Sequence, residues 1–280
     1  MAHVSDVLCF EIAKSGLRPV VTSATTLNEL SQSLPQGVYT SFRTYPGNRV
    51  LRLDAHLDRL VESAAIEGVT LTLDRHAVRQ AIASALGRSS CALARMRLTV
   101  GFAPEIIIFV SLTELHELPE TVYAQGVRCT VADRTLHREL PRSKATRFIA
   151  PGTAARAAAS DAEEVLLVSD HQQILEGSSS NFFAVCDGVL RTAGDGVLAG
   201  VTRGIVLAVA EGLLPIEYLP VALDDLPSLQ EAFVTSVSRA VLPVVAIDGA
   251  TLGTGLPGPY TREIMRRFQA RLEAELEPVS

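Results

Sequence analysis

Short runs of strand-forming residues alternate with helical stretches along this 280-residue chain. The stretch GVYTSFRTYPGNRVLRL (37–53) has two β-rich runs around the turn PGN, which predicts a hairpin. The next stretch, DAHLDRLVESAAIEG (54–68), has apolar residues at helical spacing between the capping residues Asp54 and Gly68. With 48% hydrophobic residues to fill its cores, the chain is predicted to have a mixed α+β fold.

The order of these signals divides the chain into two predicted domains. Residues 1–118 form a smaller α/β domain with the element order β-β-α-α-β-β, and residues 119–127, which carry little periodicity, form a connector. Residues 128–280 form the larger α/β domain. Its predicted elements are strands around an alanine-rich helix (152–162), a hairpin at NFFAVCDGVLRT, a helix (200–214), strand structure (231–249) and a C-terminal amphipathic helix.

Composition and motifs argue against several classes of function. No apolar run is long enough to span a membrane, and the N-terminus is acidic where a signal peptide is basic. The four cysteines and six histidines show no metal-binding spacing, and the net charge of −6 argues against nucleic acid as a partner. We therefore expect a cytoplasmic protein that binds no membrane, nucleic acid or metal.

Lysine is almost absent from the chain. All but two of the 25 Lys and Arg residues are arginine, and the exceptions are Lys14 and Lys144. A lysine amine can lose its proton and attack a carbonyl to form a Schiff base, whereas an arginine guanidinium cannot. Lys14 lies in a polar N-terminal segment and is interpreted as a surface residue, so Lys144 is the candidate nucleophile.

Three further features have complementary chemistry. Glu176 ends an apolar run, and a carboxylate in that position requires a buried cationic partner. Val201 and Thr202 follow Gly200 at a predicted helix N-terminus, where free N–H groups and the helix dipole attract an anion. Arg59 offers a guanidinium fork for a phosphate. A lysine, a carboxylate, an arginine and a helix N-terminus are together the parts that hold pyridoxal phosphate.

The order of these motifs resembles the class IV (fold type IV) pyridoxal-phosphate enzymes, which include branched-chain aminotransferases, D-amino acid aminotransferases and aminodeoxychorismate lyase. The resemblance covers almost the whole chain, from GVYTSFRTYPGNRVLRLDAHLDRLVESA through SKATRFIAP, ILEGSSSNFF and LAGVTRGIV to VTSVSRAVLPVVAIDG. It implies a two-domain, D-amino acid aminotransferase-like fold with the cofactor in a cleft between the domains and the lysine on the larger one. It also implies a homodimer in which each subunit helps to build the other's substrate pocket.

The resemblance assigns the cofactor-binding residues as well. Lys144 would form the Schiff base and carry the proton between the substrate Cα and the cofactor C4′ atom, while Glu176 would pair with the pyridine nitrogen. The phosphate would be bound by Arg59, by the backbone amides of Val201 and Thr202, and by Ser236 and Val237, where the family's threonine hydroxyl has moved or gone.

The substrate wall differs from the usual aminotransferase pattern. Tyr39 retains an aromatic residue, but Thr40 replaces the glutamate that usually follows it, as in the lyase. The run TSVSRAVLP (235–243) also lacks the Thr-Ala turn and glutamate of branched-chain enzymes, and GFAPEIII lacks the Arg-x-His pair of D-amino acid aminotransferases. Tyr39 and Arg97 are the predicted substrate-binding residues. Other candidate carboxylate contacts are Arg43, Arg95 and Arg239.

The resemblance predicts a class IV aminotransferase that exchanges an amino group between an amino acid and a 2-oxo acid. Two alternatives stay open. One is 4-amino-4-deoxychorismate lyase activity, which forms 4-aminobenzoate and pyruvate. The other is a cofactor-binding homologue without turnover, which the presence of both Lys144 and Glu176 disfavours.

Overall fold

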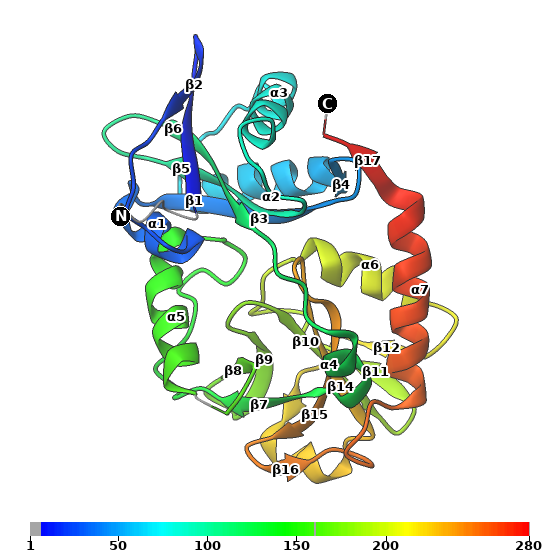
Figure 1. The fold of residues 1–280 in the computed structure, drawn as a ribbon. Helices are drawn as coiled ribbons and strands as arrows, with labels where there is room; N and C mark the ends of the chain where they lie inside the picture. The colour runs from blue at the N-terminus through cyan, green and yellow to red at the C-terminus, as the bar shows by residue number, and fades with distance from the viewer. Residues whose placement is uncertain (1–6, 160, 280) are drawn as a thin grey trace. The chain divides into compact units, whose positions relative to one another are not determined.

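The computed structural model of the protein describes residues 7–159 and 161–279. By its internal contacts the chain divides into two units. Unit 1 comprises the chain up to His116, the segment Ser143–Ala150 and the segment that starts at Glu275. Unit 2 comprises Glu117–Arg142 and Pro151–Ala274. Each unit is built on its own β-sheet (Figure 1).

Unit 1 contains a seven-stranded antiparallel sheet with the order β17-β4-β3-β5-β6-β1-β2. Its strands are β1 (Val7–Ala13), β2 (Gly16–Pro19), β3 (Gly37–Tyr45), β4 (Arg49–Leu51), β5 (Ala94–Gly101), β6 (Ile107–Glu114) and β17 (Leu276–Pro278). Its helices are α1 (Leu27–Ser33), α2 (Leu53–Ile66), α3 (Arg75–Leu86) and the short 3₁₀ helix η1 (Thr146–Phe148).

The two faces of this sheet differ in chemistry because side chains alternate along each strand. On β5, Met96 and Leu98 are fully buried on one face. The other face carries Arg97 and Thr99, and Tyr39 of β3 lies directly opposite Thr99 in the strand register. The sheet therefore carries Tyr39, Arg97 and Thr99 on one face, and Met96, Leu98 and the buried Thr40 on the other.

Unit 2 contains a ten-stranded sheet with the order β12-β11-β10-β14-β15-β7-β8-β9-β13, and β16 pairs with β15. Its strands are β7 (Val127–Val131), β8 (Glu164–Val168), β9 (Gln173–Gly177), β10 (Asn181–Cys186), β11 (Val189–Arg191), β12 (Ile216–Glu217), β13 (Val221–Ala222), β14 (Glu231–Ser236), β15 (Ala240–Ile247) and β16 (Ala250–Thr251). Its helices are α4 (Glu120–Gln125), most of α5 (Ile149–Ala158), α6 (Val201–Ala210), η2 (Leu223–Ser228) and α7 (Pro259–Glu275), which ends in unit 1.

One additional strand pairing is important for the site. Glu176 of β9 pairs with Asn181 of β10. This pairing joins two strands of the sheet path, so that β10, β14, β15, β7, β8 and β9 form a closed ring. Phe182, Leu166 and Leu242 belong to the buried apolar cluster of this unit. The polar residues Glu176 and Asn181 are thus held on strands that a large core fixes in place.

Several predicted elements are confirmed. The hairpin at NFFAVCDGVLRT is β10–β11, and its turn residues Asp187 and Gly188 have φ angles of 51° and 73°, as a two-residue type I′ turn requires. The predicted helices at 54–68 and 200–214 are α2 and α6, and the C-terminal helix is α7. The alanine-rich helix, predicted at 152–162, is α5 and begins earlier, at Ile149.

Two helices are absent from the predicted order. α4 lies inside the expected connector 119–127 and has no fully buried side chain; only Val122 and Tyr123 pack against the core, so the sequence shows no apolar periodicity there. α1 lies in the N-terminal region and does have a sequence signal: Thr26 caps it by accepting a hydrogen bond from the backbone N–H of Glu29. The cap motif TTLNE therefore offers a way to find α1 that periodicity alone does not.

The contact-based units also differ from the expected domains at two places. The sequence predicts that residues 143–150 and the C-terminus belong to the second domain, whereas their contacts assign both to unit 1. The backbone N–H of Tyr39 donates to the Lys144 carbonyl (2.9 Å), and the Gly37 N–H donates to Thr146 Oγ1 (3.0 Å). At the C-terminus, β17 pairs with β4. Lys144 therefore packs with the N-terminal sheet.

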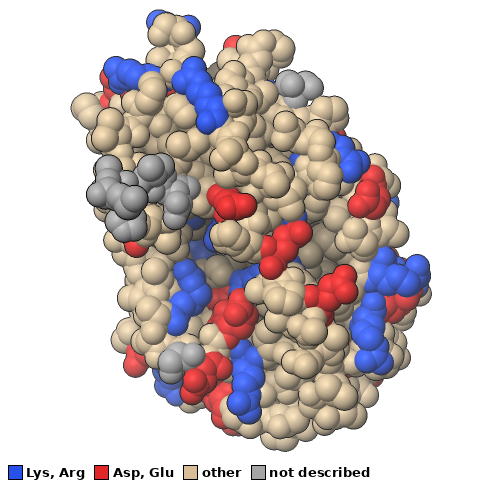
Figure 2. Space-filling view, in the orientation of Figure 1, with Lys and Arg blue, Asp and Glu red and all other residues tan. Residues whose placement is uncertain are grey.

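Charged side chains of both signs are interspersed over the described residues of the face in Figure 2. Within residues 7–159 and 161–279, no helix combines the length and the apolar character that crossing a membrane requires.

Candidate active site

Lys144 lies in an extended segment of unit 1 that is fixed through its backbone. Its N–H donates to Ser63 Oγ (3.1 Å) and its carbonyl accepts from Tyr39 N–H (2.9 Å), while the next residue, Ala145, pairs with Val38. The Lys144 amine lies 4.8 Å from the centroid of the Tyr39 ring, which is within the range of a cation–π contact. The amine is therefore held beside an aromatic face.

Arg59 lies in a buried polar cluster with Thr40 and His56. Arg59 Nη2 donates to Thr40 Oγ1 (3.0 Å), and the same hydroxyl lies 3.1 Å from His56 Nδ1. Because a guanidinium can only donate, the Thr40 hydroxyl accepts from Arg59, while the direction of its hydrogen bond with His56 Nδ1 depends on the tautomer of the histidine. Burial, and then the charges of Arg59 and Lys144, hold the pKa of His56 well below its usual value. The histidine is therefore neutral, and the positive charges here belong to Arg59 and Lys144.

Arg97 lies on the same face of the sheet as Tyr39, and its guanidinium is engaged with helix α1. It donates to the Leu27 carbonyl (2.8 Å), to Ser31 Oγ (2.6 Å) and to Asn28 Oδ1 (2.9 Å). Its Cζ atom also lies 4.6 Å from the centroid of the Tyr39 ring. Arg97 and Lys144 thus both lie over the ring of Tyr39.

The other arginines considered from the sequence lie in different environments. Arg43 lies over the ring of Tyr45, with its Cζ atom 4.6 Å from the centroid. Arg95 is exposed, although it points to the same side of β5 as the buried Arg97. In unit 1, Lys144 therefore contacts the ring of Tyr39, and the charges of Lys144 and Arg59 both act on His56; we call Tyr39, Arg59 and Lys144 the Lys144 group.

Glu176 is buried in unit 2 and is surrounded by donors. Its Oε1 atom accepts from Arg138 Nε (2.8 Å), and its Oε2 atom accepts from Asn181 Nδ2 (3.1 Å) and from the Leu198 N–H (3.1 Å). An ionised carboxylate only accepts hydrogen bonds, and all three partners donate, so the side chain is held as an anion in a fixed orientation. The sequence predicts a buried cationic partner for Glu176, but it does not indicate which arginine.

Helix α6 begins close to Glu176. Its N-cap is Gly200, which has no side chain to cap the first turn, and that turn contains Val201 and the buried Thr202. Asn181 Nδ2 donates both to Glu176 and to the Leu198 carbonyl (2.9 Å), so one amide ties the carboxylate to the segment that leads into the helix. Unit 2 therefore brings a fixed carboxylate and an open helix N-terminus into one group, which we call the Glu176 group.

Ser236 and Val237 begin the tight turn between β14 and β15. Ser236 Oγ accepts a hydrogen bond from Arg239 Nε (3.2 Å), and Arg239 Nη2 donates to the buried Glu164 (2.6 Å). Arg239, a candidate for the substrate carboxylate, is therefore paired with a carboxylate of the protein itself. Glu164 is not among the predicted site residues, although it opens a short apolar strand just as Glu176 ends an apolar run.

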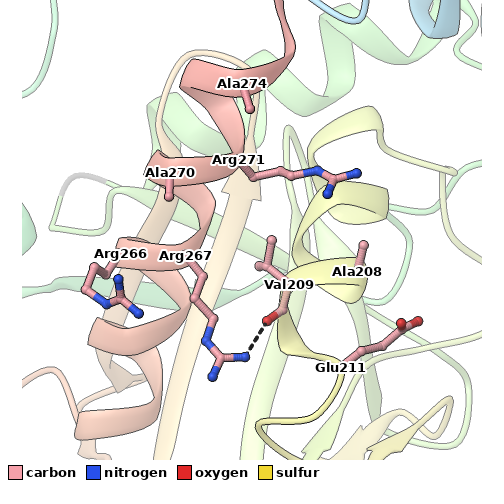
Figure 3. Close-up of a pocket in the computed structure, with 8 residues that line it drawn as sticks. All are labelled: Ala208, Val209, Glu211, Arg266, Arg267, Ala270, Arg271 and Ala274. Atoms are coloured by element: carbon pink, nitrogen blue, oxygen red, sulfur yellow. Dashed lines mark hydrogen bonds between the residues drawn. The ribbon is translucent and has the colours of Figure 1, made fainter.

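A hollow of about 450 Å³ lies elsewhere in unit 2, beside the C-terminal end of α6 and along α7 (Figure 3). It is lined by Ala208, Val209, Glu211, Arg266, Arg267, Ala270, Arg271 and Ala274. Arg267 Nη1 donates to the Val209 carbonyl (3.2 Å) across it. The hollow contains none of the predicted site residues, because Val201 and Thr202 lie in the opposite, first turn of α6.

The family model for class IV aminotransferases (Amino-transferase class IV) matches residues 37–247. This range includes all nine of the predicted site residues, and the chain belongs to this family. One relative is a branched-chain-amino-acid aminotransferase of Pseudomonas aeruginosa, 26% identical over 254 residues, which covers 83% of this chain and 82% of the relative. Another is a D-alanine aminotransferase of Bacillus licheniformis, 26% identical over 268 residues, which covers 90% and 93%.

Solved structures show the same fold. The T.th. branched-chain amino acid aminotransferase with pyridoxamine 5′-phosphate has a TM-score of 0.78 at 22% identity and covers 98% of each chain. The Escherichia coli branched-chain enzyme has a TM-score of 0.77 at 20% identity, with 98% and 99% covered. The two-sheet fold is thus that of the class IV aminotransferases, and these enzymes use pyridoxal 5′-phosphate. The aminotransferase prediction is confirmed and the lyase alternative is not favoured.

The residues present fit such a cofactor in their chemistry. Thr235 of β14 pairs with Asn181 in the strand register and is 2% exposed, and its hydroxyl has no hydrogen-bond partner among the described residues. A buried hydroxyl without a partner is costly, and a polar ligand would remove that cost. Lys144 supplies a primary amine, and Glu176 a fixed anion for a protonated ring nitrogen.

Proposed function

We propose that the chain binds pyridoxal 5′-phosphate and uses it for transamination, with Lys144 as the amine that holds the cofactor and Glu176 as the acid for its ring nitrogen. The observation that carries the proposal is the environment of Glu176: three donors hold its carboxylate ionised and buried. Such an anion is suited to keep a pyridine nitrogen protonated. Arg59, Val201, Thr202, Ser236 and Val237 would bind the phosphate.

When bound, the cofactor supplies an aldehyde that condenses with amines and a ring that draws electrons from the substrate carbon. Lys144 would hold the cofactor covalently through its Nζ atom. After the substrate amine has replaced it, the free Lys144 amine would take the proton from the substrate Cα and return it at the cofactor C4′ atom. The ring of Tyr39 beside Nζ would limit where that amine can reach.

The proposed substrate-binding residues are Tyr39 and Arg97. Tyr39 would form the wall of the pocket beside Lys144. The hydrogen bonds of Arg97 to α1 support an indirect role, in which Arg97 fixes the ring of Tyr39 from its own contact at 4.6 Å. The relatives named above act on branched-chain amino acids and on D-alanine, which supports an amino acid with an aliphatic side chain as the donor.

The decisive experiment joins spectroscopy to a two-arm assay. Protein reconstituted with pyridoxal phosphate should absorb in the near-ultraviolet to blue. It should then form a 2-oxo acid from leucine, valine or alanine only when 2-oxoglutarate or pyruvate is supplied as acceptor, with both enantiomers of each donor tested. The second arm supplies aminodeoxychorismate. Release of 4-aminobenzoate and pyruvate, with no acceptor-dependent exchange in the first arm, would contradict the proposal.

We also propose that the protein is a cytoplasmic homodimer. The family resemblance supports the dimer, and the four free cysteines support a reducing compartment. Light scattering of the purified protein would measure the mass, and a mass of one chain at micromolar concentration would contradict the dimer.

A further inference from the structure

Arg239 joins three segments of unit 2 that are distant in the sequence. Its side chain is 12% exposed. Nη2 donates to Glu164 Oε2 (2.6 Å) and to Ser179 Oγ (2.8 Å), and Nε donates to Ser236 Oγ (3.2 Å). One guanidinium thus links the start of β8, the serine turn (Ser178–Ser180) and the turn that begins at Ser236.

The hydrogen-bond directions in the serine turn follow from Glu164. This residue is 0% exposed and accepts from the hydroxyls of Ser178 (2.6 Å), Ser179 (2.7 Å) and Ser180 (2.8 Å). Burial raises the pKa of Glu164, but the charge of Arg239 and the serine hydrogen bonds outweigh it and lower the pKa to about 2. Each serine hydroxyl has only one hydrogen, and all three give it to this carboxylate. The serine turn therefore has no hydroxyl donor left for a bound anion.

Ser236 differs from the serine turn in what its hydroxyl hydrogen does. Because a guanidinium can only donate, Ser236 Oγ is the acceptor of the bond from Arg239 Nε. The hydroxyl hydrogen of Ser236 is donated to no other group in the described part of the chain, and Ser236 is half-buried. Arg239 therefore fixes Ser236 with one of its two lone pairs occupied and its hydrogen available to an acceptor.

We propose that Arg239 is a positioning residue, which turns the Ser236 hydroxyl into a donor for the cofactor phosphate and is itself anchored by Glu164. This inference rests on the proposed function, which places Ser236 at the phosphate. The charge of Arg239 is matched by that of Glu164, so Arg239 acts by orienting a neutral donor and not by attracting the anion. A phosphate oxygen only accepts hydrogen bonds, so a hydroxyl fixed as a donor binds it better than one free to rotate.

The test compares Arg239→Lys, Ser236→Ala and the double variant. A lysine can keep the ion pair with Glu164, but its single ammonium lacks the planar fork that reaches Glu164 and Ser236 together. We expect Ser236→Ala to weaken the binding of pyridoxal phosphate about tenfold, as for one hydrogen bond to a charged group. Arg239→Lys should weaken it by a similar factor, and the double variant by no more than either single one.

Binding of pyridoxal, which lacks the phosphate, separates positioning from a general structural role. All three variants should bind pyridoxal as the wild type does, and Arg266→Lys, an exposed arginine of α7, should change neither affinity. Two results would overturn the inference while leaving the proposed function intact. The first is a loss of pyridoxal-phosphate affinity in the double variant that equals the product of the losses in the two single variants. The second is a loss of affinity for pyridoxal as large as the loss for pyridoxal phosphate.

A wild type that takes up no pyridoxal phosphate at all would instead overturn the proposed function, and this inference with it. If Arg239→Lys does not fold, the Glu164→Gln/Arg239→Gln double variant replaces it, because it removes both charges of the buried pair together and leaves only the exposed Glu163 without its contact to Arg239. The same tenfold loss, specific to the phosphate-bearing ligand, is expected from that variant.

Discussion

The Nζ atom of Lys144 lies 4.8 Å from the centroid of the Tyr39 ring. The backbones of the same two residues are joined by a hydrogen bond of 2.9 Å from the Tyr39 N–H to the Lys144 carbonyl. Strand β3 therefore fixes the segment of Lys144 at the backbone and places an aromatic face beside its amine. The backbone from which the amine extends is therefore held by the sheet, which suits a group that must meet a reacting atom.

This relationship predicts different results for stability and for chemistry when Lys144 is changed. Lys144→Arg keeps a cation beside the ring, a contact worth about 0.5–1 kcal/mol, but removes the amine that would bond to the aldehyde. We expect the absorbance of bound pyridoxal phosphate to be lost in both Lys144→Arg and Lys144→Ala, and activity to fall by more than about 10³-fold. Thermal unfolding of Lys144→Arg should stay close to that of the wild type. Retained absorbance in either variant would contradict the role of Lys144.

Glu176→Gln should affect both stability and turnover. A glutamine side chain presents an NH₂ group to one of the donors around Glu176 and leaves the charge of Arg138 without its carboxylate. Breaking a buried ion pair on one side costs about 3–5 kcal/mol, so urea unfolding of the cofactor-free protein should move to clearly lower concentration. Asp170→Asn, a control in the same unit outside the site, should change neither unfolding nor activity. Unchanged unfolding of Glu176→Gln would show that the ion pair is not formed.

Two glycines of the α6 region predict changes of opposite sign. A Cβ atom on Gly200 would lie 2.2 Å from Asn181 Oδ1, so Gly200→Ala must displace the amide that binds Glu176 and the Leu198 carbonyl. We expect this variant to lose about 1–3 kcal/mol of stability and to bind the cofactor more weakly. A Cβ on Gly204, inside the helix, meets no atom within 4 Å, so Gly204→Ala should gain about 0.5–1 kcal/mol. Urea unfolding measures both, and equal effects of the two changes would contradict the role of Gly200.

The sequence predicts the two-domain α+β architecture and the family because the motifs that carry reactive or binding residues are short, continuous stretches of sequence. Lys144 is prominent in a chain that otherwise uses arginine, and Glu176 and Thr202 lie at ends of elements that periodicity and glycines delimit. The roles of these residues at the cofactor stay predictions. What the structure adds is the set of partners: Arg138 for Glu176, and Glu164 for Arg239.

These partners could not be found from the sequence for a physical reason. Each pair spans tens of residues, and with so many arginines in the chain the choice of partner is made by strand register and burial rather than by spacing. The placement of residues 143–150 has the same cause. Two of their contacts with β3, the hydrogen bond between Tyr39 and Lys144 and the bridge between Val38 and Ala145, are made by the backbone, which any residue type can do and no side-chain pattern reveals.

His56 offers a test of the buried cluster through pH. The residue is 1% exposed and is faced by the Thr40 hydroxyl, the charges of Arg59 and Lys144, and the ring of Phe42 at a centroid distance of 5.8 Å. None of these neighbours is a carboxylate, so none of them compensates a proton on His56. Burial first, and then the two positive charges, lowers its pKa well below the usual value of a histidine.

A histidine whose pKa is lowered on folding binds more protons in the unfolded state than in the native state. Stability is therefore complete above about pH 6.5, the pKa of an unfolded histidine, and falls by up to about 1.4 kcal/mol per pH unit below it until the native pKa is reached. His56→Gln should lack this part of the slope between about pH 6.5 and pH 5, whereas the exposed control His171→Gln should keep the wild-type slope. Urea unfolding at several pH values measures it. If His56→Gln and the wild type lose stability in parallel over this range, burial and the two positive charges do not lower the pKa of His56 in the native protein.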